Sequence, residues 1–354
     1  MSDDFVLPPA LERGDKVAIV GVGNGPTKDK FSEVYELGIK RLKDLFDLEP
    51  VEYPTATMSM KERTEKPEQR AQELMDAFKE DEIKGVIAPI GGTGEELRIL
   101  KYLDPEVLRN NPTRFYGYSD NTSLNLYLWK HGIISFQGPM IMTEFAMQGE
   151  MHDYTVNHSE KALFEDSIGE VKASEQFTDE TLDWNKPENL EKHRKMEENP
   201  GWEWHNTSGE IVEGRIWGGC LDVVEINLQA DKPLPEPQKL EGKILALETS
   251  EEMPDENFVD LFMMSLGERN ILEKFSAIIV GIPKARHNTK DLDLDERRDF
   301  REKQKKAIKE RVEEYAPGTP IIFNFNFGHT DPIVPLPIGG KVKIDTKSET
   351  IGFR

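Results

Sequence analysis

Residues 84–132 read KGVIAPIGGTGEELRILKYLDPEVLRNNPTRFYGYSDNTSLNLYLWKHG, and this stretch decides the fold class. Two apolar, strand-like runs, residues 84–90 and 114–119, are each followed by a polar or glycine-rich loop and then by a helical pattern. Strands that alternate with helices predict parallel pairing with helices on both faces of the sheet. Ligands of such sheets bind beyond the carboxyl ends of the strands, so the loops PIGGTGEE and GYSDNT are expected at the ligand-binding edge.

The same alternation continues on both sides of this stretch. Before it, residues 16–23 (KVAIVGVG) predict a buried strand, and residues 30–45 and 68–79 have helical patterns. Thr93 and Glu96 are spaced as a capping box, which predicts that a helix opens there. In the second half, a new α+β pattern predicts strands at 242–249, 277–283 and 320–329, and helices at 257–266 and 295–315.

The predicted organisation is α/β with two domains joined by a long connector. Residues 1–165 form the N-terminal domain, and residues 210–354 form a smaller, β-rich C-terminal domain. Between them, residues 166–209 are polar and irregular, yet they contain three of the five tryptophans of the chain. Connectors of this length are either functional or disordered. The large aromatic side chains favour a functional connector.

The charge of the chain excludes several classes of partner. Its 354 residues contain 45 Lys and Arg against 67 Asp and Glu, which gives a net charge of −22. Nucleic acids and anionic membranes bind clusters of basic residues, so neither is expected as a partner. The longest basic stretch, residues 297–306, has interleaved acids and predicts a solvated helix face. The start of the chain lacks the pattern of a signal peptide, and no apolar run approaches the roughly 18–20 residues of a membrane span, so a cytoplasmic protein is expected.

Cofactor and metal motifs are weak in this sequence. Neither glycine-rich loop has the G-x-G-x-x-G spacing, and no phosphate-binding G-x-x-x-x-G-K-[ST] occurs, so a nicotinamide oxidoreductase is disfavoured and no cofactor is expected. Seven histidines show no H-E-x-x-H pair, and the single cysteine excludes a multi-cysteine site, so no metal is expected. Because Cys220 has no histidine beside it in the sequence, the nucleophile is expected elsewhere.

Ser119 stands out among the serines because it ends a predicted strand and immediately precedes a helix. A serine on such a turn is lifted out of the sheet, and the amide that follows it points at the atom it attacks. A helix-capping serine is the alternative. The neighbouring Gly91 and Gly92 would let the backbone approach a ligand closely and complete an oxyanion hole.

A nucleophilic serine needs a base that an acid holds in orientation. His329 lies at the end of the apolar strand in FNFNFGHTDP, where it is either such a base or a capping or solvated histidine. Glu248 ends the strand GKILALE, where a carboxylate needs a partner because an unpaired buried charge is costly. The order of the three residues along the chain carries no constraint, since triads are defined by geometry.

Taken together, these segments resemble a known family. The motifs APIGGTGEELRIL, FYGYSDNTSLNL, ISFQGPM, VEGRIWGGCL, GKILALETSEE, SAIIVGIP and NFGHTDPIVPLPIG are similar, in order and spacing, to those of the LD-carboxypeptidase family of serine peptidases. The resemblance covers nearly the whole chain. It implies a flavodoxin-like N-terminal domain, a smaller β-rich C-terminal domain, a homodimer and a site at the domain junction.

The resemblance also implies roles for single residues. Ser119, Glu248 and His329 would form a Ser–Glu–His triad, and the backbone amides of Gly92 and Asp120 would form the oxyanion hole. Gly91 of the same loop is expected to contact the substrate. One departure from common family usage is Thr249, where an acidic residue is expected after the glutamate, and this affects how Glu248 is held.

The substrate depends on the branch of the family. The stretch TDETLDWNKPE resembles the microcin C self-immunity branch, in which the matching tryptophan, here Trp184, stacks on the adenine of an aminoacyl-nucleotide. Such stacking contributes about 1–3 kcal/mol. Alternatively, Trp184 only pins the loop to the surface, and the enzyme releases a terminal D-alanine from murein tetrapeptides. A non-catalytic nucleotide-binding protein is the alternative of a different class.

Overall fold

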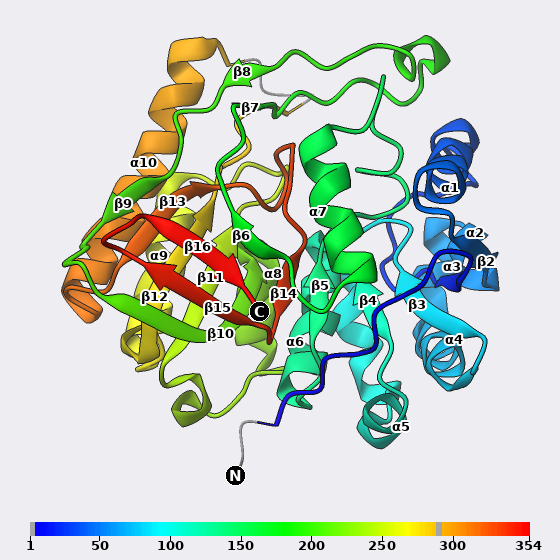
Figure 1. Ribbon diagram of the computed structural model, residues 1–354, viewed down its shortest axis with the longest axis horizontal. Coiled ribbons are helices and arrows are strands. Elements are labelled where there is room, and N and C mark those ends of the chain that lie inside the picture. Colours follow the sequence, from blue (N-terminus) through cyan, green and yellow to red (C-terminus); the bar gives the residue numbers. More distant parts are fainter. Residues whose placement is uncertain (1–3, 288–291) are drawn as a thin grey trace.

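Two sheets stand side by side in the molecule, and a third, small sheet lies in the connector (Figure 1). The computed structural model describes residues 4–287 and 292–354. The first sheet has a parallel centre, and its last strand pairs antiparallel with β5. Its strands, in spatial order, are β14 (Leu336–Ile338), β5 (Ser135–Gln137), β4 (Arg114–Tyr116), β3 (Ile83–Ile87), β1 (Lys16–Ile19) and β2 (Glu49–Glu52).

The second sheet also has a parallel centre, with antiparallel strands on both sides of it. Its strands, in spatial order, are β6 (Gly169–Val171), β16 (Thr350–Phe353), β15 (Lys341–Asp345), β10 (Ile211–Cys220), β11 (Lys243–Glu248), β12 (Phe275–Gly281), β13 (Ile321–Phe325) and β9 (Glu203–His205). The connector therefore supplies both edge strands, β6 and β9. The small sheet pairs β7 (Gln176–Phe177) with β8 (Glu197–Glu198).

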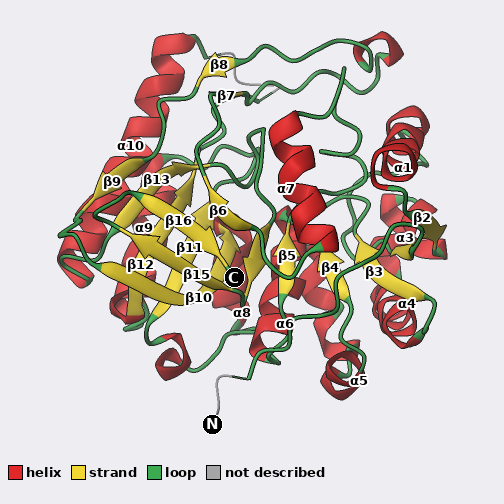
Figure 2. Cartoon of the chain, in the orientation of Figure 1, coloured by secondary structure: helices red, strands yellow, loops and turns green. Residues whose placement is uncertain are grey.

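Helices cover the sheets, as the secondary-structure colours make plain (Figure 2). They are α1 (Ser32–Phe46), α2 (Pro54–Thr57), α3 (Met60–Glu65), α4 (Pro67–Lys79), α5 (Pro105–Asn110), α6 (Thr122–Lys130), α7 (Asp153–Phe164), α8 (Leu221–Ala230), α9 (Glu256–Glu268) and α10 (Leu294–Tyr315). Helix α6 contacts both β5 and β10, and α9 packs along α10. The α/β fold class with a parallel N-terminal sheet and a second β-rich sheet is thus confirmed.

A shared apolar core joins the two sheets. Tyr116 and Phe136 of the first sheet belong to the same buried cluster as Ile244 and Ile279 of the second. The strand β14 lies in sequence between β13 and β15 of the second sheet, but it pairs with β5 of the first sheet. In addition, the indole Nε1 of Trp129 donates to the carbonyl of Ile216 across the seam at 3.0 Å. These contacts fix the two sheets in one relative position.

The sequence prediction of a solvated face over residues 297–306 holds for only one side of α10, where Arg298, Lys303 and Lys306 are exposed. Arg297, Arg301 and Lys305 are each less than 9% exposed. Since they recur every four residues, they share one face of the helix, and that face holds acids of the connector. Arg301 pairs with Asp179 at 2.5 Å, and Lys305 pairs with Glu203 at 3.0 Å. The connector thus docks on Arg297, Arg301 and Lys305 of α10. Figure 1 shows α10 beside the second sheet, near the connector strands β8 and β9.

The predicted capping box after β3 is wrong. Short 3₁₀ turns, η1 (Glu95–Arg98) and η2 (Leu100–Tyr102), replace the expected α-helix, and Gly94 at the start of η1 provides no side-chain cap. The Thr93 hydroxyl lies by Asn24, and the Glu96 carboxylate is fully buried and accepts from the amide of Leu124. Tertiary contacts therefore outweigh the local capping signal.

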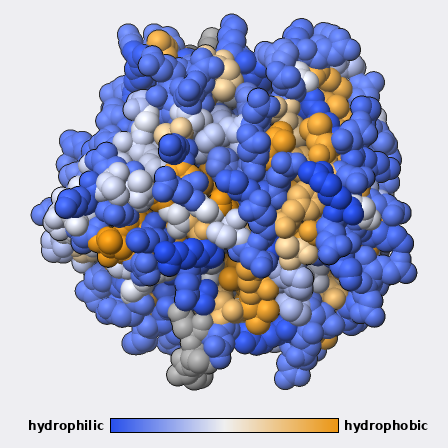
Figure 3. Space-filling model, in the orientation of Figure 1, coloured by the Kyte–Doolittle hydropathy of each residue, from blue (hydrophilic) through white to orange (hydrophobic). Residues whose placement is uncertain are grey.

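The surface is largely hydrophilic, with apolar side chains confined to small areas of the face drawn in Figure 3. Exposed large hydrophobic side chains among the described residues include Leu45, Ile211, Leu261 and Leu294. None of the helices in the described part of the chain has the length and apolar character of a membrane span.

Candidate active site

Ser119 lies on a sharp turn between β4 and α6. It opens a short 3₁₀ turn, η3 (Ser119–Asn121), and its backbone φ is 61°, a left-handed value that is strained for a residue with a side chain. Gly91 packs directly against it, since a Cβ added to Gly91 would lie 2.8 Å from the Ser119 Cβ. Ser119, with its strained backbone, thus lies at the carboxyl edge of the sheet, against the loop that contains Gly91. Within the described residues, its Oγ makes no hydrogen bond.

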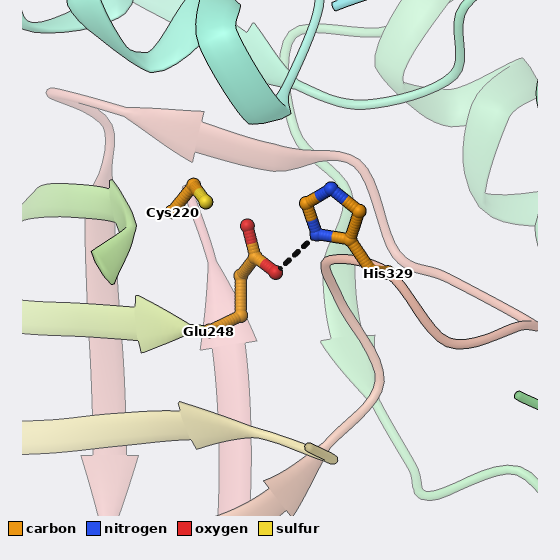
Figure 4. A group of neighbouring side chains, drawn as sticks. All are labelled: Cys220, Glu248 and His329. Carbon is orange, nitrogen blue, oxygen red and sulfur yellow. Dashed lines mark hydrogen bonds and ion pairs between the residues drawn. The ribbon is translucent and has the colours of Figure 1, made fainter. Parts of the chain in front are cut away.

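Glu248 and His329 form a close pair at the carboxyl edge of the second sheet (Figure 4). The His329 Nδ1 and the Glu248 Oε2 are 2.6 Å apart. Glu248 is the last residue of β11 and only 2% exposed, and its other oxygen accepts from Gln137 Nε2 at 3.2 Å. Gly328 permits this approach, because a Cβ there would lie 2.5 Å from Oε2 of Glu248. The pair therefore has the geometry of an acid that orients an imidazole.

The other side of the imidazole faces Glu251. The His329 Nε2 lies 3.0 Å from the Glu251 Oε2, although their alignment is not that of a hydrogen bond. Burial lowers the pKa of His329, but the carboxylates of Glu248 and Glu251 outweigh burial and hold the pKa well above its usual value. Burial likewise raises the pKa of Glu251, but the histidine outweighs it and brings the pKa to about 2. The imidazole therefore lies between two carboxylates that both favour its protonated form.

The backbone amides predicted for the oxyanion hole lie next to Ser119. Neither the Gly92 nor the Asp120 N–H donates a hydrogen bond within the described part of the chain. Gly92 has no room for a side chain, because an added Cβ would lie 2.4 Å from Asn24 Oδ1 and 2.5 Å from Asp120 Oδ2. The two donors are therefore free to take an oxygen that develops negative charge.

Three charged groups behind Ser119 were not foreseen from the sequence. The Asp120 carboxylate accepts from the Glu96 amide at 3.3 Å, and both carboxyl groups are buried near Arg70. Burial raises the pKa of Asp120 to about 7, and burial together with Asp120 raises the pKa of Glu96 well above its usual value. The Ser119 turn thus rests on carboxyl groups that favour the protonated form. The acids of GTGEEL in the sequence were the only signal of this arrangement.

A cavity of about 300 Å³ joins these groups. Its wall includes every catalytic and binding candidate except the two that lie behind it, Glu248 and Asp120. Trp184 of the connector is part of this wall, and its ring meets Phe31 edge-on at 5.3 Å. The cavity wall also has charged side chains that were not predicted from the sequence, namely Glu144, Arg194, Glu251, Glu252, Lys284 and Asp331.

Although Cys220 has no histidine beside it in the sequence, it lies close to the Glu248–His329 pair in space. Among the described residues, its Sγ, a Glu248 oxygen and a His329 ring nitrogen are all within 4.8 Å of one another (Figure 4). Burial, followed by the charge of Glu248, raises the pKa of the Cys220 thiol well above its usual value. The cysteine is fully buried and does not line the cavity, so it packs behind the glutamate.

Cys220, Glu248 and His329 are of the types that ligate metals, but the contact between Glu248 and His329 has the length of a hydrogen bond. Two ligands of one zinc ion stand more than about 3 Å apart, given metal–ligand distances of about 2.0–2.3 Å. The 2.6 Å contact from Nδ1 to Oε2 is a hydrogen-bond distance. Thr249 is buried and its hydroxyl lies 3.5 Å from Gln304 Oε1, so Glu248 is oriented by Gln137 and not by its neighbour in sequence.

Serine, histidine and carboxylate side chains that meet in a cavity at the carboxyl edges of two parallel-centred sheets have the composition of a hydrolase site. Comparison with known proteins specifies the class. Residues 17–138 match the LD-carboxypeptidase N-terminal domain, and residues 213–344 match the LD-carboxypeptidase C-terminal domain. The chain therefore belongs to the LD-carboxypeptidase family and is a peptidase-type hydrolase, which confirms the resemblance found in the sequence.

Individual relatives cover most of the chain. YocD of Bacillus subtilis is 30% identical over 80% of this chain and 79% of its own length. The microcin C7 self-immunity protein MccF of Escherichia coli is 29% identical over 80% of this chain and 78% of its own length. An MccF-like protein from Streptococcus pneumoniae, solved in complex with AMP, has a TM-score of 0.83 at 28% identity and covers 96% of this chain and 98% of its own.

Proposed function

We propose that this protein hydrolyses an amide bond through a covalent acyl-enzyme on Ser119. His329 takes the proton of the serine hydroxyl, the oxygen attacks the carbonyl carbon, and the amides of Gly92 and Asp120 hold the oxyanion. The imidazolium then protonates the leaving nitrogen, and water releases the acyl group by the reverse sequence. Glu248 keeps Nδ1 protonated and stabilises the imidazolium. The 2.6 Å contact between Glu248 and His329, next to a strained serine in the same cavity, carries this proposal.

The resting arrangement adds one requirement to this mechanism. A protonated imidazole cannot accept the serine proton, so His329 must first lose the proton that its two carboxylate neighbours stabilise. Activity is therefore expected to rise with pH. Nε2 must also give up its contact with Glu251, which lies 3.0 Å away, before it can accept the proton of Ser119.

Amides that carry a nucleotide are the first proposed substrate class. Trp184 lines the cavity of the nucleophile and thus offers an aromatic surface to a base. The AMP complex of the Streptococcus pneumoniae relative supports the same class. Trp184→Ala is expected to lower kcat/KM for a nucleotide-bearing amide by about 5- to 150-fold, the loss of one stacking contact. Trp204→Ala, which changes a tryptophan outside the cavity wall, is the matched control.

Peptides with a free carboxyl terminus are the second class. Here the supporting observation is the ammonium group of Lys284 in the cavity, in a family of carboxypeptidases. A murein tetrapeptide that ends in D-alanine is the test case for this class.

One experiment tests the reaction and separates the two classes. The pure protein is incubated with a murein tetrapeptide or with an aminoacyl-sulfamoyl adenosine, and the products are identified by mass spectrometry. Ser119→Ala is expected to abolish product formation with its melting temperature nearly unchanged, whereas Ser265→Ala on α9 retains activity. Near-normal turnover by Ser119→Ala would rule out the proposed nucleophile. Tight binding of either compound by the wild-type protein without any product would identify a binding protein.

A further inference from the structure

Lys284 is a buried cation at the wall of the catalytic cavity. It follows β12 in the chain and is 7% exposed. Its Nζ donates to the Thr181 Oγ1 at 3.0 Å and to the backbone carbonyl of His329 at 3.4 Å. An ammonium group has three N–H donors, so one donor has no acceptor among the described residues. Burial, followed by the charge of Arg194, lowers the pKa of Lys284, as expected for a cation without a counter-ion.

The acids around Lys284 are paired with other cations. Asp331 pairs with Arg194 at 2.7 Å, and Glu251 lies 3.0 Å from the His329 ring. Asp179, the third acid, is held by Arg286 at 2.8 Å and by Arg301 at 2.5 Å. Within the described residues, no carboxylate oxygen lies within the 4.0 Å ion-pair distance of the Lys284 Nζ. A buried ammonium in this position is costly unless an anion joins it.

The position of Lys284 indicates which part of a substrate brings that anion. In the proposed reaction the acyl carbon is attached to Ser119, and His329 delivers its proton to the leaving nitrogen. The leaving fragment therefore lies on the His329 side of the cavity. Lys284 is on the same side, because its Nζ donates a hydrogen bond to the backbone carbonyl of His329. A cavity of about 300 Å³ has room for a small leaving group of this kind.

We propose that Lys284 binds the anionic group of the leaving fragment, which places the scissile bond next to Ser119. This anion is the α-carboxylate of a leaving amino acid or the phosphate-type group of a leaving nucleotide. The assignment rests on the proposed hydrolysis, and it predicts a preference for amide bonds next to a negatively charged leaving fragment. Since Lys284 also bonds Thr181 of the connector, its test must separate anion binding from a purely structural contact.

Matched substrates provide that separation. kcat and KM are measured for a tetrapeptide acid and for the same peptide as its C-terminal amide, with the wild type, Lys284→Met and the control Lys306→Met. Lys306 is an exposed lysine of α10. Lys284→Met is expected to lower kcat/KM on the acid by about 10- to 100-fold, mainly through KM, which is the range for a lost hydrogen bond to a charged group. Its rate on the amide stays close to that of the wild type, and Lys306→Met changes neither rate.

A parallel binding measurement identifies the source of the anion and does not need turnover. Calorimetry compares the tetrapeptide acid, its amide and AMP on Ser119→Ala and on Ser119→Ala/Lys284→Met. Loss of affinity for the acid alone assigns the carboxylate, and loss for AMP alone assigns the phosphate. Equal losses on acid and amide, or no loss with any anion, overturn the proposal. If the wild type cleaves none of these compounds, the proposed hydrolysis fails, but the calorimetry still decides the role of Lys284.

A charge-retaining variant covers the case in which Lys284→Met does not fold. Lys284→Arg keeps a cation at the site and is expected to keep the preference for the acid over the amide. If Lys284→Arg folds, with an unchanged melting curve, and loses this preference completely while Lys306→Met retains it, the cation is not the recognition element and the proposal is wrong.

Discussion

The contact between Glu251 and His329 leads to a quantitative prediction about pH. Glu251→Gln removes one of the two carboxylates that hold the imidazole in its protonated form, while the Glu248 contact remains. The removed charge lies 3.0 Å from Nε2, and its side chain is 49% exposed. Because water screens a half-exposed group strongly, the dielectric constant of water is the appropriate one, and Coulomb's law then gives about 1.4 kcal/mol at this distance. This energy corresponds to about one pH unit.

The sign follows from the role of the base. Only the neutral imidazole accepts the serine proton, so kcat/KM rises with pH through the pKa of His329, which the two carboxylates raise. Glu251→Gln lowers this pKa, and the acidic limb of the kcat/KM profile is expected to move down by about one pH unit. The assay is hydrolysis of the better substrate between pH 4 and 9, at constant ionic strength.

Glu252→Gln is the matched control because it removes the same charge from the next residue. Glu252 also lines the cavity, but its carboxylate makes no contact with His329 in the described structure. The control is expected to move the acidic limb much less than Glu251→Gln does. An acidic limb that stays in place, or that moves to higher pH in Glu251→Gln, would refute the assignment of His329 as the base clamped by Glu251.

Further predictions concern stability and the nucleophile turn. Burial, together with the neighbouring Asp331, raises the pKa of Glu144 from 4.5 to about 7. Protonation of Glu144 therefore stabilises the fold at low pH, and this stabilisation is lost as pH rises from 4.5 through 7. In urea unfolding, Glu144→Gln is therefore expected to be more stable than the wild type at pH 8, by up to roughly 3 kcal/mol, and about as stable as the wild type at pH 4. An equal change in unfolding free energy at pH 4 and pH 8 would contradict this prediction. Gly91→Ala places a methyl group 2.8 Å from the Ser119 Cβ and is expected to lower kcat more than about 100-fold while the far-UV spectrum is retained. Arg301→Met leaves Arg286 as the remaining cation beside the buried Asp179 and is expected to reduce the unfolding free energy by about 1.5–3 kcal/mol, and intact stability would show that the connector is held by other contacts.

The sequence predicts the main elements of the fold because each has a local cause. Alternating apolar strands and helical patterns locate β3, β4 and α6, and the strand-end positions of Ser119 and Glu248 single them out before any contact is known. The prediction at Thr93 and Glu96 is wrong because the local capping signal says nothing of Asn24 or of Leu124, which lie far along the chain.

The ion pairs that hold the connector and the charged side chains of the cavity could not be predicted from the sequence. Pairing between Arg301 and Asp179 spans 122 residues, and no periodic pattern encodes such a pair. The spacing of Arg297, Arg301 and Lys305 at every fourth residue was a usable signal, because three long cations on one helix face suit an acidic partner segment. A lysine at the end of the apolar run AIIVGIPK is a similar signal for Lys284, since residues next to the end of a buried strand are themselves often buried.

The path of the chain through His329 determines how a substrate enters. After β13 of the second sheet, the chain passes through His329 and then enters the first sheet as β14. This segment therefore links the two sheets, with one strand in each. A hinge that opened the two halves would pull β14 away from β5 and move the base away from Ser119. The halves must therefore stay closed during turnover. We therefore expect substrate to enter past the connector, which contributes Trp184, Arg194 and Thr181 to the wall of the cavity.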